Sequence, residues 1–236
     1  MKKILANIIF IFLLILTLGL GKWFSQKFEN EKIHDTKVLV YPLDKNFIQV
    51  NEIKKMINYK DSILGHIDIS QLENQLKKNR FVARAEVYKD LNNNVYAYVE
   101  QFTPIARVMG DKSYYIDSQA NKRPLSDHYT ENVILVFGNP NEKKIQDIYH
   151  LIEKINADVF LKEKITEIHL NNQGDYLLKA MDFNPEVYFG DIKNIQKKLN
   201  KLKTILLFLK KNHLSNKYVK IDLSFDNQIV CKRIKN

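Results

Sequence analysis

The sequence predicts an α+β protein in which a membrane-spanning helix precedes two folded domains. An apolar run occupies Ile4–Gly21, near the start of a chain of 236 residues. The next part reads β-α-α-β-β, which excludes a parallel doubly wound sheet because a short turn joins its last two strands. The remainder is typical of a mixed or antiparallel β-sheet with two covering helices. We expect a cytoplasmic tail over 1–3, a transmembrane signal-anchor over 4–21, a linker over 22–36, a first domain over 37–104 and a second over 105–236.

The N-terminal run is long enough to cross a bilayer. Its eighteen residues are interrupted only by Asn7 and Thr17, and a span needs about 20 apolar residues, with about 17 as the lower edge. Trp23 and Phe24 follow, as interfacial aromatic side chains do. A cleaved signal peptide is the alternative, but its apolar core is about 7–15 residues and ends at a small-x-small site, which is missing here. We expect Ile4–Gly21 to remain in the lipid bilayer and the domains to lie outside the cytoplasm.

Composition disfavours several classes of function. The net charge is +10, and the segment 191–236 holds most of it, which leaves an anionic membrane or an acidic partner as alternatives to a solvated surface. An extracytoplasmic position argues against nucleic acid as a partner. The six histidines are scattered, the glycines form no phosphate-binding cluster, and Cys231 is the single cysteine. We therefore expect no cofactor, no metal site, no small-molecule substrate and no catalytic residue.

The first domain is expected to begin with a strand over Lys37–Tyr41 and a short helix over Val50–Asn58. A second helix follows the N-cap Asp68, with Gln71 at the capping-box position, and ends at Asn79. Alternation then predicts two strands joined by a turn. The alternating apolar side chains are Phe81, Ala83, Ala85 and Val87 on the first strand, and Val95, Ala97 and Val99 on the second. The alternation predicts that these side chains face inward, but it leaves open whether Phe81 or Val82 faces the core.

The second domain is expected to contain short strands and two long helices. The first helix carries apolar residues from Ile145 to Val159 at helical spacing, and the second begins at Asp191 and continues to Leu209. We interpret the lysines of the second helix most simply as a solvated face. The strands are expected at Ile105–Met109, Ser113–Asp117, Asn132–Phe137, Ile165–Leu170, Tyr176–Met181 and Glu186–Phe189, followed by a closing hairpin of Tyr218–Phe225 and Gln228–Arg233.

Residues with catalytic chemistry are present but weakly patterned. Ser126, Asp127 and His128 are adjacent, and a capped turn explains them better than a triad, because sequence neighbours lack the required geometry. The carboxylates Glu100, Asp111 and Asp117 could serve an extracytoplasmic hydrolase. Any chain with 27 acidic residues offers such pairs. An inert strand residue is the better interpretation of Cys231.

Several segments, in this order behind one N-terminal helix, resemble the bacterial FtsQ/DivIB cell-division family. Two segments resemble the POTRA domain of that family, namely Asp61–Leu64 with the following Asp68, and Phe81–Val87. The segments that resemble its β-domain are Pro104–Val108, Tyr114–Asp117 with Pro124–Ser126, Ile221–Leu223 and Asn227–Cys231. The chain departs from the family pattern at Ala120, where glycine is usual, and at Ser224, where arginine is common.

This resemblance implies a non-enzymatic, single-pass scaffold of the divisome. It implies a cytoplasmic (inner) membrane location at the division septum, with a periplasmic C-terminal domain. It also implies that the protein binds FtsB and FtsL and helps control septal peptidoglycan synthesis. A POTRA-bearing chaperone or secretion module and a membrane-anchored cell-wall hydrolase are the alternative functions.

The closing hairpin is the candidate partner-binding site. An uncovered strand presents unpaired N–H and C=O groups, which proteins protect with charge or use for strand addition. The cationic side chains of the last strand could guard this edge or contact an acidic segment. The family resemblance favours contact with a partner and implies that Phe225, at the bend of the hairpin, is an apolar anchor for that partner. The expected edge residues are Phe225, Asn227, Gln228, Ile229, Val230, Lys232 and Arg233.

Overall fold

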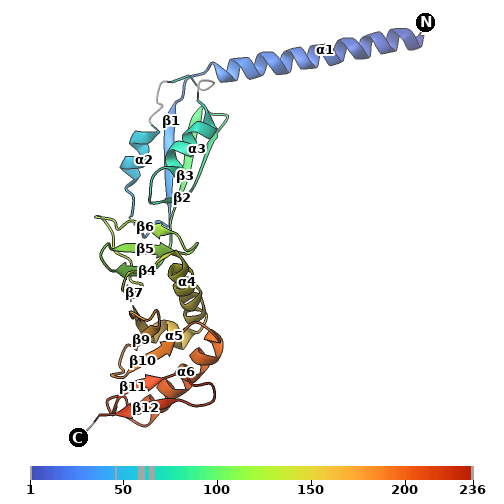
Figure 1. Ribbon diagram of the computed structural model, residues 1–236. Helices are drawn as coiled ribbons and strands as arrows, with labels where there is room; N and C mark the ends of the chain where they lie inside the picture. Colours follow the sequence, from blue (N-terminus) through green and yellow to red (C-terminus); the bar gives the residue numbers. More distant parts are fainter. Residues whose placement is uncertain (1, 46, 58–61, 64–66, 235–236) are drawn as a thin grey trace. The chain divides into compact units, whose positions relative to one another are not determined.

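The computed structural model describes residues 2–45, 47–57, 62–63 and 67–234. The chain divides into two compact units, Met1–Gln101 and Phe102–Asn236 (Figure 1). Five positions that bound expected segments lie outside the described residues: Met1, Asn58, Asp61, Leu64 and Asn236.

The first unit opens with α1 (Lys2–Glu29), a single continuous helix. Among the described residues, α1 is the one helix that is both long enough and apolar enough to cross a membrane, and the part that meets this criterion is Ile9–Lys27. It is longer than the expected span of 4–21 and takes in the first part of the expected linker. Its 28 residues correspond to about 42 Å at 1.5 Å per residue. That length is close to the ~40–45 Å of a bilayer including its headgroup regions.

A three-stranded sheet follows, in the order β1-β3-β2, with β1 (Asp35–Tyr41), β2 (Val82–Lys89) and β3 (Asn94–Gln101). The central strand β3 is parallel to β1 and antiparallel to β2. Two helices, α2 (Val50–Met56) and α3 (Ile69–Lys77), lie between β1 and β2 in the chain and contribute to the same core as the strands. The expected β-α-α-β-β order is therefore confirmed.

The cap predicted for α3 and the alternation predicted for β3 are both present in the structure. The Asp68 carboxylate accepts the Gln71 N–H at 2.9 Å, which caps α3 as expected. Every second residue of β3 is buried, including Val95, Ala97 and Val99. The expected inward position of Ala83 is wrong. A bulge between Val82 and Arg84 interrupts the alternation of β2, so that Val82 is buried and Ala83 is exposed.

The second unit contains a nine-stranded mixed sheet in the order β12-β11-β10-β9-β8-β7-β4-β5-β6. Three neighbouring pairs are parallel, namely β4 with β7, β7 with β8, and β10 with β11, and the others are antiparallel. The strands are β4 (Pro104–Met109), β5 (Tyr114–Asp117), β6 (Lys122–Arg123), β7 (Ile134–Phe137), β8 (Ile165–Leu170), β9 (Tyr176–Ala180), β10 (Glu186–Gly190), β11 (Tyr218–Asp222) and β12 (Val230–Arg233).

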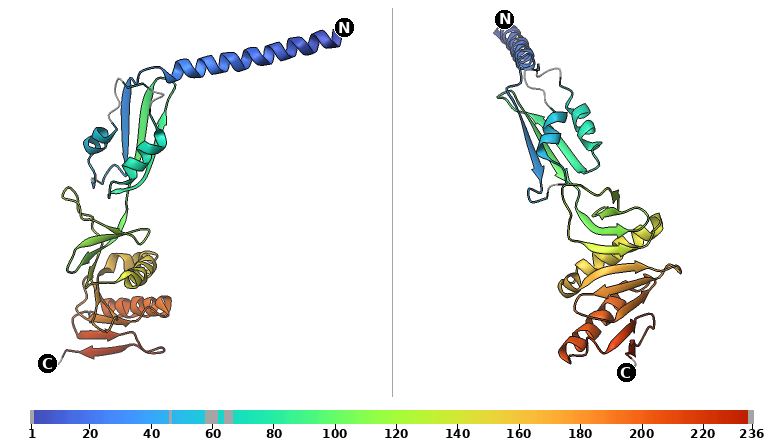
Figure 2. Two further views of the ribbon diagram at one scale, coloured as in Figure 1. Left: turned by 45° about the horizontal axis from the view of Figure 1, so that its top comes forward. Right: turned by 90° about the vertical axis from the view of Figure 1, so that its left-hand side faces the viewer.

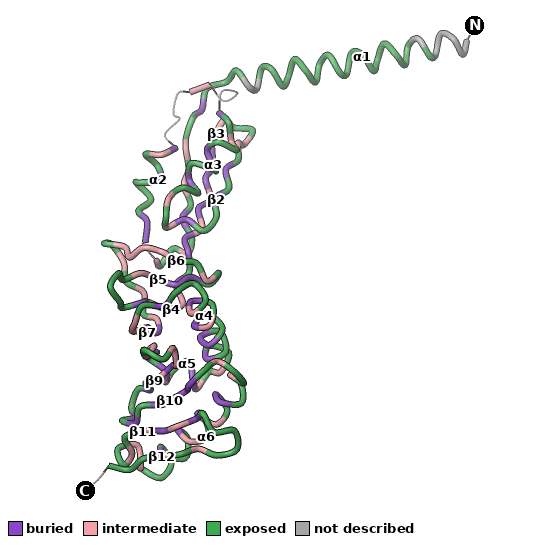
Figure 3. Tube along the Cα trace, viewed as in Figure 1, coloured by how far each residue is buried: buried purple, intermediate pink, exposed green. Residues whose placement is uncertain are grey.

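Two long helices, α4 (Glu142–Asn156) and α6 (Ile195–Lys211), lie on the same side of this sheet (Figure 2, left). Their apolar faces and alternate strand residues form one core, and the buried positions follow the strands (Figure 3). The expected extension of the first helix to Val159 is wrong. Asp158 caps a separate short helix, α5 (Val159–Lys164), and the Val159 side chain is 76% exposed.

The second long helix begins at Ile195, four residues after the expected Asp191, because Asn194 takes a left-handed conformation with φ of 53°. The interpretation of the helix lysines as a solvated face is wrong for Lys198. Lys198 is buried, and its Nζ donates to the backbone and side-chain oxygens of Asp191, each at 2.8 Å. Its ammonium also lies 5.2 Å from the ring centroid of Phe189. Pairing with an acid and an aromatic ring is what allows a lysine to be buried.

Candidate partner-binding edge

The strand β12 stands at one end of the nine-stranded sheet. It pairs antiparallel with β11, with Cys231 opposite Ile221 and Val230 opposite Asp222. Within the described part of the chain, no strand pairs with its other side. The strand is shorter than expected, because Gln228 and Ile229 belong to the loop that precedes it. The structure thus places the last strand at a sheet edge.

One hydrogen bond fixes the direction of the backbone groups at this edge. The N–H of Ile234 donates to the carbonyl oxygen of Lys217, just before β11, at 3.1 Å. Successive N–H groups of a strand point to opposite sides. The N–H groups of Val230 and Lys232 therefore point toward β11, and those of Cys231 and Arg233 point away from it. These last two are the donors that an added strand would meet.

The side chains around this edge combine apolar and cationic groups. Phe225, Val230 and Ile234 are 46%, 41% and 46% exposed. Lys232 and Arg233 are exposed, and the Arg233 guanidinium lies 5.7 Å from the ring centroid of Tyr218. An apolar centre with a charged rim is the usual composition of a protein interface.

One of the expected edge residues, Ile229, faces inward instead, together with Cys231. Ile229 and Cys231 are half-buried and pack against the core of the second unit. Burial raises the pKa of the Cys231 thiol, which keeps the thiol protonated and suits a strand residue better than a nucleophile. These two positions therefore anchor the strand rather than present a contact surface.

A lysine of α6 holds the loop before β12. Lys201 Nζ donates to the carbonyl oxygens of Leu223 at 2.9 Å and of Phe225 at 2.6 Å. The neighbouring Lys197 lies 3.7 Å from the carboxylate of Asp226. Burial lowers the pKa of Lys201. The residue type favours a solvated position for Lys201, so its contact with this loop could not be read from the sequence.

The turn after β5 uses one of the candidate carboxylates. Asp117 is almost fully buried and accepts the backbone N–H groups of Gln119 and Asn121 at 2.9 and 2.8 Å. Its other oxygen accepts Arg123 Nε at 2.7 Å. Ala120, where the family usually has glycine, takes a left-handed φ of 61°. Asp117 thus stabilises a tight turn, with its oxygens committed to structural contacts.

The serine and histidine that flank Asp127 also form a turn. Ser126 Oγ accepts the backbone N–H of His128 at 3.1 Å, which is the capped turn expected from the sequence. Among the described residues, no group of three or more histidine, cysteine, aspartate or glutamate side chains is placed to hold a metal ion.

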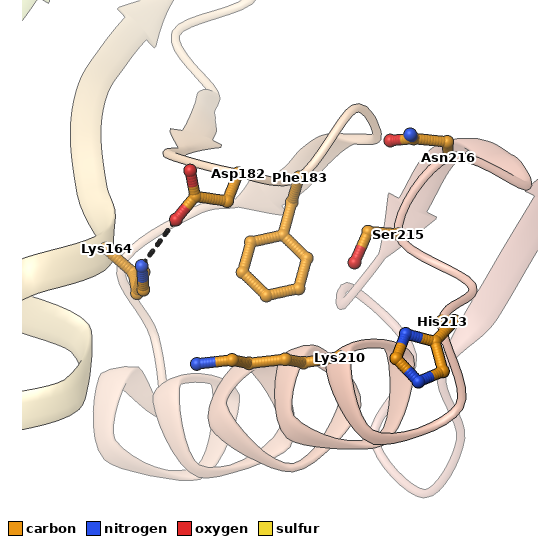
Figure 4. A pocket seen from close by; sticks show the side chains of 7 residues that line it. All are labelled: Lys164, Asp182, Phe183, Lys210, His213, Ser215 and Asn216. Atoms are coloured by element: carbon orange, nitrogen blue, oxygen red, sulfur yellow. Dashed lines mark hydrogen bonds and ion pairs between the residues drawn. The ribbon is translucent and has the colours of Figure 1, made fainter.

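A pocket of about 310 Å³ lies elsewhere in the second unit (Figure 4). Lys164 and Asp182 form an ion pair of 2.6 Å at one side of the pocket. The ring of Phe183 lies beside this ion pair (Figure 4). The lining residues are Lys164, Asp182, Phe183, Lys210, His213, Ser215 and Asn216. The expected edge residues are not among them.

Comparisons with known proteins found the following similar chains. A relative, the cell division protein DivIB of Clostridium tetani (strain Massachusetts / E88), is 22% identical over 213 residues, covering 83% of this chain and 76% of the relative. The chain is also similar to a solved structure of the major extracytoplasmic domain of DivIB from Geobacillus stearothermophilus. The identity is 17% and the TM-score 0.35, over 48% of this chain and 97% of that one.

Two family models match the two folded regions. The model of a POTRA-like domain matches residues 39–100, which the structure folds into β1, α2, α3, β2 and β3. The model described as FtsQ/DivIB, C-terminal related, matches residues 103–232 and thereby takes in the whole sheet of the second unit up to β12. With more than half of its length covered by that second model, the chain belongs to the FtsQ/DivIB family of cell division proteins.

Proposed function

We propose that this chain is a non-enzymatic, single-pass scaffold of the bacterial divisome. In this proposal α1 lies in the cytoplasmic membrane, and both folded units are periplasmic at the division septum. The edge strand β12 binds the FtsB/FtsL pair, and the complex helps control septal peptidoglycan synthesis. Family membership supports a role in cell division. The length and apolar character of α1 support the membrane anchor.

The observation that carries the proposed partner site is the uncovered edge of β12 with its surrounding side chains. Strand addition supplies affinity through backbone hydrogen bonds and selectivity through side-chain contacts. The outward N–H groups of Cys231 and Arg233 would provide the first contribution. Phe225, Val230 and Ile234 would provide the apolar contacts. The cations Lys232 and Arg233 would attract an acidic segment in a salt-dependent way.

The experiment compares two substitutions at one residue. Arg233→Pro removes an outward N–H and the guanidinium, whereas Arg233→Ala removes the guanidinium alone. Proline is tolerated on an edge strand where its missing N–H faces solvent, so the fold should survive. Loss of a net 0.5–1.5 kcal/mol for the hydrogen bond, together with obstruction by the ring, should weaken binding by about tenfold.

Binding of the purified full chain to FtsB/FtsL is measured in detergent for both variants, and near-UV circular dichroism checks their fold. The proposal expects weaker binding of Arg233→Pro than of Arg233→Ala. Equal affinity of the two folded variants would place the partner on another surface. Lys232→Glu tests the electrostatic contribution separately and should reduce the association rate most at low salt.

A further inference from the structure

The β2–β3 hairpin of the first unit carries the most exposed of the large apolar side chains that the structure describes. Leu91, at the tip of this hairpin, is 83% exposed. Its neighbours form a well-ordered polar turn, in which the Asp90 carboxylate accepts the N–H groups of Asn92 and Asn94 at 2.9 and 2.8 Å. The turn is therefore built without any help from the leucine. The Leu91 side chain is thus accessible to a contact outside the fold.

The pairing of the strands brings this tip next to the segment that directly follows the membrane anchor α1. Because β1 is parallel to β3, with Asp35 opposite Asn94, the hairpin tip lies at the end of the sheet where β1 begins. The His34 N–H donates to the Asn93 carbonyl oxygen at 2.9 Å. His34 is only five residues beyond Glu29, the last residue of α1. Five extended residues reach at most about 18 Å.

The helix itself brings its C-terminal end to the outer boundary of the lipid headgroups. Its length of about 42 Å spans both the hydrocarbon core and the headgroup regions, and any tilt would draw its end closer to the hydrocarbon. The residue bonded to the hairpin turn is thus tethered within about 18 Å of that boundary. The bilayer surface is within reach of Leu91.

The side chains beside the tip are those that membrane interfaces favour. Tyr88, which is 52% exposed, stacks on Tyr96 with ring centroids 4.9 Å apart. Lys37 Nζ lies 5.3 Å from the Tyr96 ring centroid and 3.4 Å from its hydroxyl. Tyrosine and lysine combine an apolar body with a polar end and occupy the headgroup level. They lie on the face of the sheet opposite the core residues Val87, Val95 and Ala97.

We propose that the β2–β3 hairpin is a second, shallow membrane contact, in which Leu91 inserts into the lipid interface and Tyr88, Tyr96 and Lys37 lie among the headgroups. The occupant of this surface is the bilayer that holds α1. The contact restricts how the first unit is oriented above the membrane. This inference rests on the membrane anchorage in the proposed function.

The test uses the full chain with Cys231→Ser as background, so that one new cysteine carries an environment-sensitive NBD label. The test variant is Leu91→Cys, and Asn92→Cys repeats the measurement at a neighbouring exposed position. Leu43→Cys is the matched control. Leu43 is 79% exposed and follows Tyr41, which pairs with Glu100 at the opposite end of the same sheet. Each protein is reconstituted into phosphatidylcholine vesicles with and without a headgroup-attached nitroxide quencher.

The inference expects a blue-shifted NBD emission that the nitroxide quenches at positions 91 and 92, and an unshifted, unquenched emission at position 43. Equal emission at positions 91, 92 and 43 in protein that floats with the vesicles would overturn the hairpin contact while leaving the anchor intact. Failure to float would instead contradict the proposed anchorage. A shift at position 91 that grows with protein density and escapes the quencher would assign the surface to another protein chain and overturn the lipid contact.

Discussion

Lys201→Met tests whether the loop before β12 is held in place by α6. The substitution keeps most of the aliphatic stem and removes the ammonium that donates to the carbonyl oxygens of Leu223 and Phe225. We expect the loop to separate from the helix. Both the stability of the second unit and its affinity for FtsB/FtsL should fall, because Phe225 would lose its fixed position.

The magnitude follows from the two hydrogen bonds. A hydrogen bond to a charged group contributes about 1.5–3 kcal/mol. The cost of burying the ammonium, which also lowers the pKa of Lys201, offsets part of this gain. Solvent screening reduces it further. We expect a net loss of about 1–2 kcal/mol, which lowers the melting temperature of a domain of this size by roughly 3–8 °C.

The matched control is Lys193→Met, which makes the same chemical change just before α6. The Lys193 side chain is 86% exposed and lies 3.8 Å from the Asp191 carboxylate. Thermal unfolding of the full chain in detergent, followed by near-UV circular dichroism, compares the two variants. If Lys201→Met melts at the same temperature as Lys193→Met and binds FtsB/FtsL equally well, the loop does not depend on Lys201.

Three further predictions concern the core, a charged helix cap and the topology. Val82→Asp should destabilise the first unit by several kcal/mol, because Val82 is buried, whereas Ala83→Asp should change the melting temperature little. Asp158 caps α5 and pairs with Lys203 at 2.7 Å, and this hydrogen bond lowers the Asp158 pKa below the ordinary 3.8. Its contribution is present above that ordinary value and is lost as the pH falls through the lowered one. Asp158→Asn should therefore cost about 0.5–1 kcal/mol near pH 7 and nearly nothing near pH 2, as measured by chemical denaturation. A reporter active only in the cytoplasm should stay inactive when fused to the C-terminus, and its activity there would contradict the proposed orientation.

The sequence predicted those elements whose patterns are local. The helix α3 and the strand β3 follow their caps and periodicities closely, because each buries one face against a single core. The bulge in β2 depends on its pairing with β3, and alternation counted along one strand cannot show it. The start of α6 depends on the left-handed Asn194, a conformation that asparagine tolerates but does not require.

The candidate edge was predictable in part. The hairpin of β11 and β12 was expected, but the separation of inward Ile229 and Cys231 from outward Val230 emerges only from the strand pairing. The roles of Lys198 and Lys201 depend on contacts with residues 7 and 22 or more positions away. Residue type alone favoured a solvated position for both. Long-range pairing is the information that a single sequence lacks.

The most direct test of the account is amide hydrogen exchange on β12 with and without FtsB/FtsL. The peptide that covers Val230–Arg233 should exchange more slowly in the complex, because an added strand would accept the outward N–H groups of Cys231 and Arg233. The peptide that covers β6, at the other end of the sheet, serves as the control and should be unchanged. Protection that appears elsewhere in the second unit while β12 exchanges as in the free chain would contradict strand addition at this edge.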